Sequence, residues 1–282
     1  MRAVAEVDLD VAAGEVVGIA GPNGAGKSTL IAMLMGFIAP DGGSISIDGL
    51  APRAFVEREG IGYLPELMTL PLTWRTEETL QRLAALADVP AVERSAVVTR
   101  VIDAVGIGEH RRKKLKTLSK GNLQRVGLAQ SLLTERRVMI FDEPTHGLDP
   151  VWTARFRDIV AGLRRPDRAM LIASHNLDEL ERLCDRVAII DAGRIQRVVE
   201  MRGAQVSSEV RRWRIRCAAG AEALAAQLLD ARVEGNDVSC ATDLVSLNRA
   251  LAVAIAGGTL ISAIVPAESS LEEAFRNAVT AR

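Results

Sequence analysis

Short runs of apolar residues alternate with helix-like patterns along the first two thirds of the chain. The runs at residues 16–20, 138–141, 169–173 and 187–190 are almost entirely apolar, and polar or glycine-containing turns follow them. Between the runs, apolar residues recur at spacings of three and four, as they do in amphipathic helices. Strands that are apolar on both faces belong to mostly parallel sheets covered by helices. The pattern therefore predicts an α/β fold, with functional groups collected where the strands end.

From about residue 67 the pattern changes to helices alone. Two apolar stripes recur at helical spacing: the first is Leu80, Leu83, Ala84 and Ala87, and the second is Val97, Val98, Val101, Ile102 and Val105. We therefore expect a helical subdomain at about 67–133, inserted into the sheet domain.

Near residue 203 the pattern changes again, to alternating apolar and polar positions typical of half-buried strands. The order of elements beyond this point is βαββαβ, which predicts a small ferredoxin-like α/β domain. We therefore expect a first domain at 1–203 and an accessory domain at 204–282. The elements expected in the accessory domain are a strand around 213–217, a helix at 221–229, two strands flanking a turn at 235–237, a helix from 244, a strand at 260–265 and a closing helix at 269–281.

The composition of the 282 residues excludes several classes of protein. With 48% apolar and 25% charged residues, the chain is not of the disordered kind. A net charge of -1 argues against nucleic acid as the main partner. Cys184, Cys217 and Cys240 show no metal-binding spacing and are expected to be free thiols in a reducing compartment. No signal-peptide pattern opens the sequence, and the longest apolar stretch, 251–265, is too short to span a membrane.

The segment GPNGAGKS at residues 21–28 (the P-loop) matches the phosphate-binding pattern GxxxxGK[ST] between a strand and a helix. In such a loop the backbone N–H groups converge on phosphates. Lys27 adds a positive charge at the β- and γ-phosphates, and the Ser28 hydroxyl is suited to magnesium. The pattern predicts a P-loop NTPase fold and indicates a nucleoside triphosphatase or a kinase. The residues expected to bind ATP are Gly21, Pro22, Asn23, Gly24, Ala25, Gly26, Lys27, Ser28 and Thr29.

Two further motifs help to distinguish a nucleoside triphosphatase from a kinase. Asp142 and Glu143 follow an apolar strand, which suits magnesium binding and water activation, although acidic pairs also end strands without any such role. The segment LSKGN at residues 118–122 (the signature segment) precedes an amphipathic helix. It resembles the LSGGQ signature of ATP-binding cassette (ABC) proteins, with Lys120 and Asn122 replacing the third and fifth residues.

The resemblance to ABC proteins extends in order along nearly the whole chain. It implies that Glu143, His175 and Lys27 are catalytic and that Ser28, Glu66 and Asp142 hold Mg²⁺. Glu66 stands where the family has glutamine. Outside these motifs, His110 and His146 have no such support and are expected to be structural. The matching motifs are the P-loop, YLPE at 63–66 for the Q-loop, the signature segment, a Walker B strand at 138–143, GLD at 147–149 for the D-loop and His175 for the switch histidine.

In the family, two cassettes pack head to tail with ATP between the P-loop of one and the signature of the other. The helix N-terminus at Ser119 and Gly121 offers N–H donors to a γ-phosphate, but it is not expected to reach its own P-loop across the sheet. The resemblance therefore implies a homodimer, or a heterodimer with a second cassette, in which Ser119, Gly121 and Asp149 act in trans.

The resemblance implies an ATPase subunit with ATP and Mg²⁺ as cofactors, cytoplasmic and peripheral on the inner face of the cell membrane. Its partners would be separate membrane-spanning permease subunits. The closing segment SLEEAF at 270–275 resembles the tails of bacterial drug, antibiotic and polysaccharide exporters, which favours export. The alternative is a soluble, non-transport ABC ATPase acting on ribosomes or DNA.

Two features near the expected ATP site leave alternatives open. The apolar residues that follow Glu66 form either part of the helical core or a groove for a helix of the transporter. Family members stack adenine on an aromatic residue before the P-loop, but none precedes Phe37, so either the true start lies upstream or this protein dispenses with the ring. Val4 is then expected to offer an apolar edge to the base. The apolar residues after Glu66 are Leu67, Met68, Leu70, Leu72 and Trp74.

Overall fold

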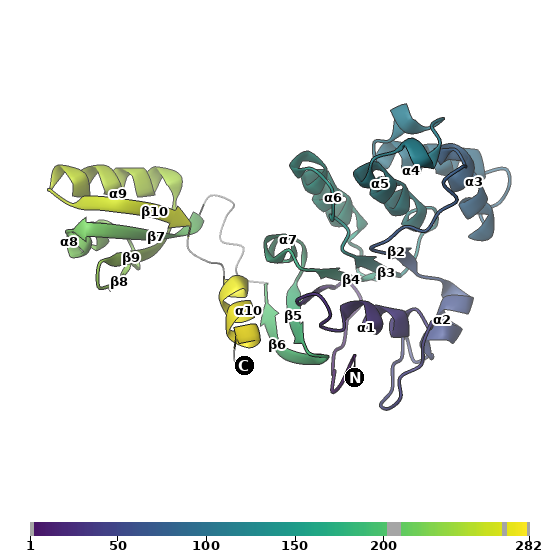
Figure 1. Ribbon diagram of the computed structural model, residues 1–282, viewed down its shortest axis with the longest axis horizontal. Helices are drawn as coiled ribbons and strands as arrows, with labels where there is room; N and C mark the ends of the chain where they lie inside the picture. The colour runs from purple at the N-terminus through teal and green to yellow at the C-terminus, as the bar shows by residue number, and fades with distance from the viewer. Residues whose placement is uncertain (1–2, 202–209, 267–269, 281–282) are drawn as a thin grey trace. The chain divides into compact units, whose positions relative to one another are not determined.

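The computed structural model describes residues 3–201, 210–266 and 270–280. The chain divides into two compact units, 1–199 and 200–282, which are described separately (Figure 1). The sequence pattern placed the boundary between residues 203 and 204.

The first unit is built on a six-stranded sheet with the order β2-β3-β4-β1-β5-β6. The first five of these strands pair in parallel, which confirms the predicted mostly parallel sheet. The turn between the last two strands contains Ala192 and Gly193, both with positive φ, as two-residue hairpin turns require. The strands are β1 (Val16–Ala20), β2 (Gly62–Leu64), β3 (Val138–Asp142), β4 (Ala169–Ser174), β5 (Arg186–Asp191) and β6 (Arg194–Glu200).

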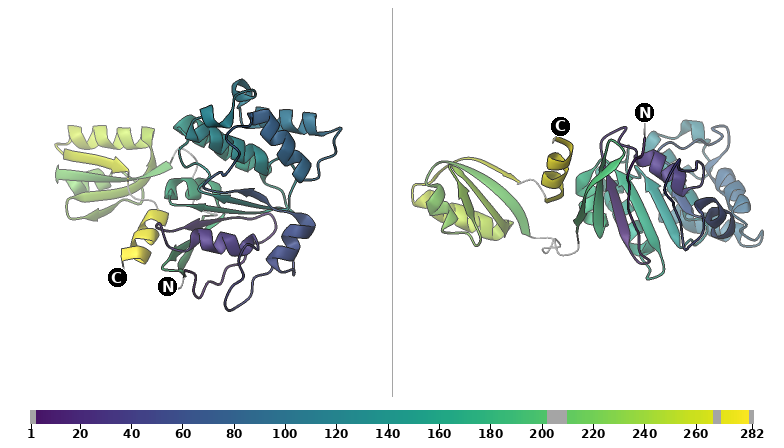
Figure 2. Two further views of the ribbon diagram at one scale, coloured as in Figure 1. Left: turned by 45° about the vertical axis from the view of Figure 1, so that its right-hand side comes forward. Right: turned by 90° about the horizontal axis from the view of Figure 1, so that it is seen from below.

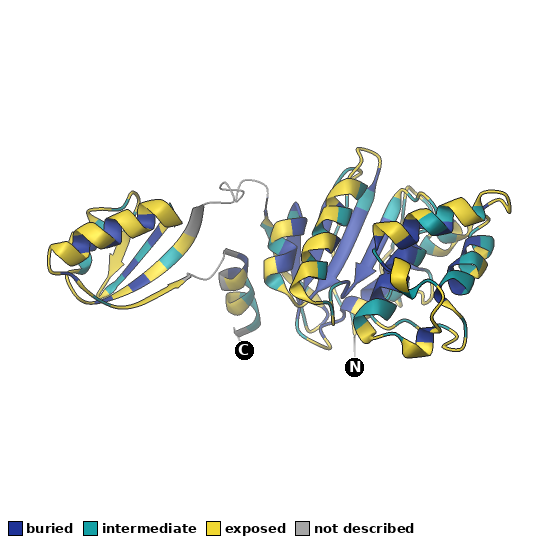
Figure 3. Ribbon diagram, turned by 90° about the horizontal axis from the view of Figure 1, so that it is seen from above, coloured by how far each residue is buried: buried dark blue, intermediate teal, exposed yellow. Residues whose placement is uncertain are grey.

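Helices cover both faces of this sheet (Figures 1 and 2). All five residues of β1 are buried, because the strand lies in the middle of the sheet. One core packs Ile19 and Ile140 of the strands against Leu30 and Ile31 of α1. Figure 3 shows the inner strands of the sheet buried and the outer faces of the helices exposed. The flanking helices are α1 (Lys27–Leu34), α2 (Pro52–Glu59), α6 (Pro150–Leu163) and α7 (Leu177–Leu183).

The predicted helical subdomain consists of three α-helices and two short 3₁₀ turns. Most residues of the two apolar stripes expected from the sequence are buried. Leu80, Ala84, Val98, Val101, Ile102 and Val105 are at most 1% exposed, whereas Leu83, Ala87 and Val97 are only partly buried. The elements are α3 (Thr76–Leu86), α4 (Arg94–Ala104), the turns Gly108–His110 and Leu115–Thr117, and α5 (Lys120–Ser131).

The second unit has the predicted βαββαβ order and an antiparallel sheet with the order β10-β7-β9-β8, as in ferredoxin-like folds. Its core packs Ile215, Cys217 and Val238 of the sheet against Leu247 and Leu251 of α9. The last helix is α10; residues 269 and 281, the expected ends of that helix, lie outside the described residues. The elements are β7 (Val210–Ala219), α8 (Ala221–Ala225), β8 (Arg232–Glu234), β9 (Asp237–Asp243), α9 (Leu244–Ala256), β10 (Leu260–Pro266) and α10 (Ser270–Thr280).

The structure also bears on membrane spans and cysteine pairing. None of the helices among the described residues is long and apolar enough to cross a membrane. The three cysteines are buried and form no disulfide, as the sequence predicted.

Candidate active site

The carboxyl ends of β1, β3 and β4 meet at one edge of the sheet. The strand register places Ala20 beside Ser174 and Asp142 beside Ala173. The segments that follow these strands therefore leave the sheet at the same level and enclose a cavity of about 580 Å³. The cavity is lined by Ala3, Pro22, Asn23, Gly24, Ala25, Gly26, Lys27, Ser28, Thr29, Glu66, Asp142, Glu143, His146 and His175.

The P-loop adopts a conformation that requires glycine at two positions. Gly24 and Gly26 have φ values of 81° and 110°, which side-chain-bearing residues rarely adopt. A Cβ atom on Gly26 would also lie 2.4 Å from the carbonyl oxygen of Ala3. The loop leads directly into α1 at Lys27, so the free N–H groups at the start of that helix face the cavity side. Such a helix start favours a phosphate group.

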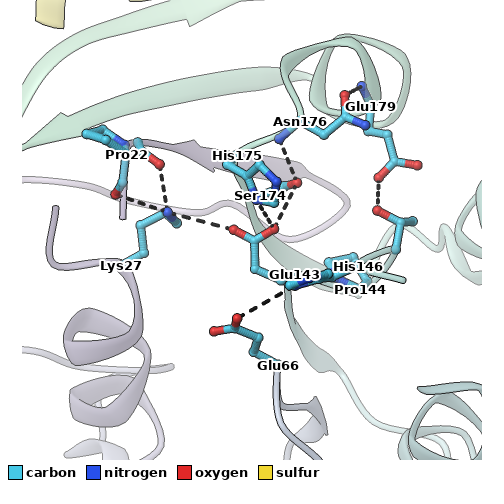
Figure 4. A network of polar contacts seen from close by, with 12 residues as sticks. Pro22, Lys27, Glu66, Glu143, Pro144, His146, Ser174, His175, Asn176 and Glu179 are labelled. Carbon is cyan, nitrogen blue, oxygen red and sulfur yellow. Dashed lines mark hydrogen bonds and ion pairs between the residues drawn. The ribbon is translucent and has the colours of Figure 1, made fainter. Parts of the chain in front are cut away.

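Lys27 holds its ammonium group at the mouth of this loop. Its side chain is only 7% exposed, and Nζ donates to the carbonyl oxygens of Gly21 (2.7 Å) and Pro22 (3.3 Å). Nζ also lies 3.7 Å from Oε1 of Glu143 (Figure 4). The cation is therefore fixed between the P-loop and the end of β3, where it can attract phosphate oxygens.

Glu143 is a buried carboxylate in a strained backbone position. Its φ is 47°, a region that non-glycine residues avoid and that often marks functional sites. Its N–H donates to the carbonyl oxygen of Ala173 (2.8 Å), which fixes it against the end of β4. Its Oε2 lies 2.7 Å from Nδ1 of His175 and accepts from the Ser174 hydroxyl at 3.4 Å. Glu143 and His175, both predicted to be catalytic, thus form one hydrogen-bonded pair (Figure 4).

Asp142 has the properties expected of a metal ligand. Burial raises its pKa to about 6; a hydrogen bond with Ser28 and the charge of Lys27 oppose this rise, and the nearby Glu66 and Glu143 add to it. Its Oδ1 is buried and has no hydrogen-bond partner. An oxygen of this kind, beside a serine hydroxyl, fits a divalent cation.

Magnesium suits this donor set better than a metal that needs many protein ligands. No cluster of three or more His, Cys, Asp or Glu side chains that could hold a metal occurs among the described residues. Mg²⁺ needs no such cluster, because it is usually held by one or two carboxylates together with water and substrate phosphates. The predicted ligands Ser28, Glu66 and Asp142 all line the cavity.

The three residues predicted to act in trans are absent from the lining of this cavity. Ser119 is exposed and caps α5, its hydroxyl accepting from the N–H of Asn122 at 3.3 Å. Asp149 is exposed and caps α6, its Oδ1 accepting from the N–H of Trp152 at 2.9 Å. Gly121 lies in the first turn of α5. These residues therefore border a surface rather than the chain's own cavity.

The fifth residue of the signature segment, Asn122, turns into the helical subdomain. Its Nδ2 lies 2.9 Å from Nε2 of His110, and its Oδ1 accepts from the guanidinium group of Arg125 at 2.7 Å. His110 thus contacts a neighbouring side chain within the helical subdomain, and the structural role expected for it stays a prediction.

The structure corrects the prediction for His146, which lies in the cavity wall. Its Nδ1 is 3.7 Å from Oε1 of Glu66, and its Nε2 is 3.0 Å from Nζ of Lys120. Its ring also contacts the ring of His175, with centroids 6.1 Å apart. The available sequence signal was its place three residues after Glu143, in the loop between a strand end and the D-loop motif.

A second residue that sequence reasoning missed is Glu179 in α7. It is 2% exposed, and burial raises the pKa of its carboxyl group. The Thr145 hydroxyl donates to Oε2 of Glu179, which ties the loop after Glu143 to α7 (Figure 4). The signal was an acidic residue four positions after His175.

Val4 is not brought into the cavity. Its side chain packs against the core cluster between the sheet and α1, and Ala3 lines the cavity instead. Residues 3–12, which include Val4, form no strand.

The apolar residues after Glu66 divide between the two expected roles. The side chain of Met68 packs against Gly127 of α5, where a Cβ atom would lie 2.6 Å from its sulfur. Trp74 is half-buried, with the guanidinium carbon of Arg82 4.3 Å from its ring centroid. Leu67 and Leu72 are exposed, at 72% and 51%. Part of the set is therefore core, and part is available to a partner.

Comparison with known proteins gives one family. The family model described as "ABC transporter" matches residues 4–146, half of the chain. An uncharacterized ABC transporter ATP-binding protein of Nostoc sp. is 38% identical over 191 residues, covering 66% of this chain and 56% of the relative. The methionine import ATP-binding protein MetN of Caulobacter vibrioides is 36% identical (68% and 60% covered), and the Nod factor export ATP-binding protein I of Mesorhizobium japonicum is 31% identical (68% and 57% covered). The chain spans less than two thirds of the length of each of these relatives.

Solved structures show the same fold. The structure of an ATP-binding subunit of an ABC transporter is 29% identical and has a TM-score of 0.64, covering 72% of this chain and 85% of that one. A dimeric ATP-binding cassette in a post-hydrolysis state, bound to ADP and phosphate, is 22% identical and has a TM-score of 0.65, with 71% and 91% covered.

Proposed function

This chain belongs to the ABC transporter family, and on that premise we propose that it binds and hydrolyses ATP as the ATP-binding subunit of a transporter. One observation carries the proposal: Lys27, Asp142, Glu143 and His175, which come from three separate strand ends, converge on one cavity behind the P-loop. A glycine loop alone would bind phosphate. The buried carboxylate paired with a histidine adds the means to activate water.

In the proposed reaction, Glu143 accepts a proton from the water that attacks the γ-phosphorus, and ADP is the leaving group. His175 orients the carboxylate through the 2.7 Å contact of its Nδ1 with Oε2. Lys27 and the N–H groups of the P-loop stabilise the negative charge on the phosphate oxygens. Ser28, Asp142 and Glu66 would hold magnesium, which would neutralise part of the negative charge on the phosphates.

We further propose that two cassettes form a head-to-tail dimer, with this chain or a second cassette as the partner. Ser119, Gly121 and Asp149 do not line the chain's own cavity. Ser119 and Asp149 are exposed at the starts of two helices, where free N–H groups favour an anion. This placement supports a role at the nucleotide of the other cassette.

The remaining part of the proposal is a cytoplasmic subunit that docks on separate membrane-spanning permease subunits. Exposed Leu67 and Leu72 follow directly after Glu66 of the cavity and offer apolar contact area for a partner helix. The names of the relatives include both import and export. The proposal of export rests on the resemblance of segment 270–275 to exporter tails.

ATP hydrolysis by the purified full chain tests the central claim. Lys27→Met should abolish activity and weaken ATP binding, because the ammonium group at the P-loop is lost. Lys113→Met removes the same charge from an exposed position and should behave like the parent. A parent chain without ATPase activity, or a Lys27→Met variant as active as the parent, would overturn the proposal. Copurification with a ribosome or DNA instead of a membrane protein would point to the non-transport alternative.

A further inference from the structure

His146 lies between two residues that belong to different motifs. On one side its Nδ1 is 3.7 Å from Oε1 of Glu66, which lines the nucleotide cavity. On the other side its Nε2 is 3.0 Å from Nζ of Lys120, the third residue of the signature segment. Figure 4 shows the contact of His146 with Glu66 beside the Glu143–His175 pair. The ring thus connects segments that are 54 residues apart in sequence, from 66 to 120.

The chemistry of the three groups fixes the direction of these contacts. An ammonium group has protons but no lone pair, so Lys120 donates and Nε2 of His146 accepts. A neutral imidazole that accepts at Nε2 carries its proton on Nδ1, and this is the atom that faces the Glu66 carboxylate. The Lys120 cation, the dipole of the His146 ring and the Glu66 anion therefore lie in an electrostatically favourable order.

Two glycines bring the backbones of the same segments together. A Cβ atom on Gly121 would lie 2.9 Å from the carbonyl oxygen of Gly147. A Cβ atom on Gly147, which has a φ of 82°, would lie 3.3 Å from Cδ of Lys120. The first turn of α5 therefore packs directly on the loop that carries His146, and a displacement of that loop reaches Lys120 through two routes.

We propose that His146 is a positioning residue that transmits the occupancy of the cavity from Glu66 to Lys120 and the first turn of α5. The inference rests on the proposed function, because it takes the cavity to be the nucleotide site. Phosphate and its cation change the charge that Glu66 faces, and His146 responds through Nδ1 while it holds Lys120 through Nε2. In the proposed dimer this turn faces the nucleotide of the other cassette, so His146 couples the two sites.

The effect of losing the His146 contacts should be small, because the three side chains are exposed to water. The side chains of His146 and Glu66 are 41% and 40% exposed, and Lys120 is exposed. Polar contacts that water reaches in this way are weak, and their loss changes an equilibrium by about 1.5- to 5-fold. We therefore expect His146 to adjust the response of α5 rather than to decide whether nucleotide binds.

Amide hydrogen exchange of the full chain tests the inference, with ADP and magnesium as the probe. Light scattering must show a monomer, so that protection by a second chain does not contribute. In the parent, ADP should slow exchange in residues 22–28 and also alter exchange in residues 119–124. His146→Leu should keep the first response and reduce the second by about 1.5- to 5-fold. His146→Gln should keep both, because its amide accepts from Lys120 and donates to Glu66.

Lys120→Met provides an independent variant if His146→Leu melts at a lower temperature than the parent. It removes the contact between Lys120 and His146 from the Lys120 side and should reduce the exchange response of residues 119–124. An unchanged response of residues 119–124 in both variants, or an equal loss in His146→Gln, would overturn the inference. An absence of any ADP response at residues 22–28 in the parent would overturn the proposed function, and the inference with it.

Discussion

Replacing Asp142 with Asn should stabilise the nucleotide-free protein while it removes a metal ligand. Asp142 is 4% exposed, and its Oδ1 has no hydrogen-bond partner. Glu66 and Glu143 add repulsion to the cost of burying its charge. An amide of the same shape carries no charge, so the variant relieves a cost that the parent bears only because the site serves a cation.

The magnitude follows from the pKa of Asp142. Burial raises this pKa from 3.8 to about 6, so the folded protein binds the proton more tightly than the unfolded chain does. Each pH unit corresponds to about 1.4 kcal/mol, which gives at most about 3 kcal/mol. Because water reaches part of the site, we expect a gain of about 1–3 kcal/mol, or roughly 2–12 °C in Tm for a unit of this size.

The stability gained by Asp142→Asn should increase with pH. Well below pH 4 Asp142 is protonated in both states, and Asp142→Asn gains nothing. Between pH 4 and pH 6 the unfolded chain loses the proton first, so the stability of the parent falls relative to the variant. Well above pH 6 the gain of the variant is constant.

Thermal melts of the nucleotide-free parent and variant between pH 4 and pH 8 measure this difference. The matched control is Asp158→Asn, which removes an exposed carboxylate from α6 and should change Tm little at any pH. A variant that melts below the parent at pH 7.5, or a gain that increases on acidification, would refute the reasoning.

Three other predictions test the site and its surroundings. Glu143→Gln should keep ATP binding, lower turnover by roughly 10²–10⁴-fold and leave a persistent ATP-bound dimer; turnover at the parent rate would remove Glu143 from the role of base. Trp74→Ala should uncouple transport while it spares the ATPase activity of the isolated subunit; a large loss of Tm would instead assign Trp74 to the core. The described residues that line the cavity include no Phe, Tyr or Trp, so ATP should bind about 5- to 150-fold more weakly than to a cassette with a stacking ring, and GTP nearly as well as ATP; tight, adenine-selective binding would contradict this.

The elements that could be predicted from the sequence are those with an unambiguous hydrophobic pattern. β1, β3, β4 and β5 are apolar runs buried on both faces, which few other structures produce. β2 has only three residues, and β6 has no buried position, with five exposed and two half-buried residues, so neither could be distinguished from a loop. The expected helix at 221–229 ends at Ala225, and Leu229, which was expected to lie in it, is 89% exposed.

In the candidate site, the residues of local motifs could be predicted from the sequence, whereas residues placed by long-range contacts could not. Lys27, Asp142, Glu143 and His175 follow strands in short motifs, and parallel register brings such ends together. The contacts of His146 depend instead on Glu66, which follows β2, and on Lys120, the first residue of α5, and no local pattern encodes that meeting. Val4 fails to enter the cavity for a related reason: Ala3 approaches Gly26 through its backbone, which leaves the Val4 side chain on the core side.

The ammonium group of Lys27 lies close to the carboxylate of Glu143, the proposed base, with 3.7 Å between Nζ and Oε1. On the proposed function, a γ-phosphate competes with Glu143 for Lys27, so arrival of the triphosphate itself sets the base free. Departure of phosphate would then let the ion pair between Lys27 and Glu143 form again, so that one cation serves the phosphate and the carboxylate in turn.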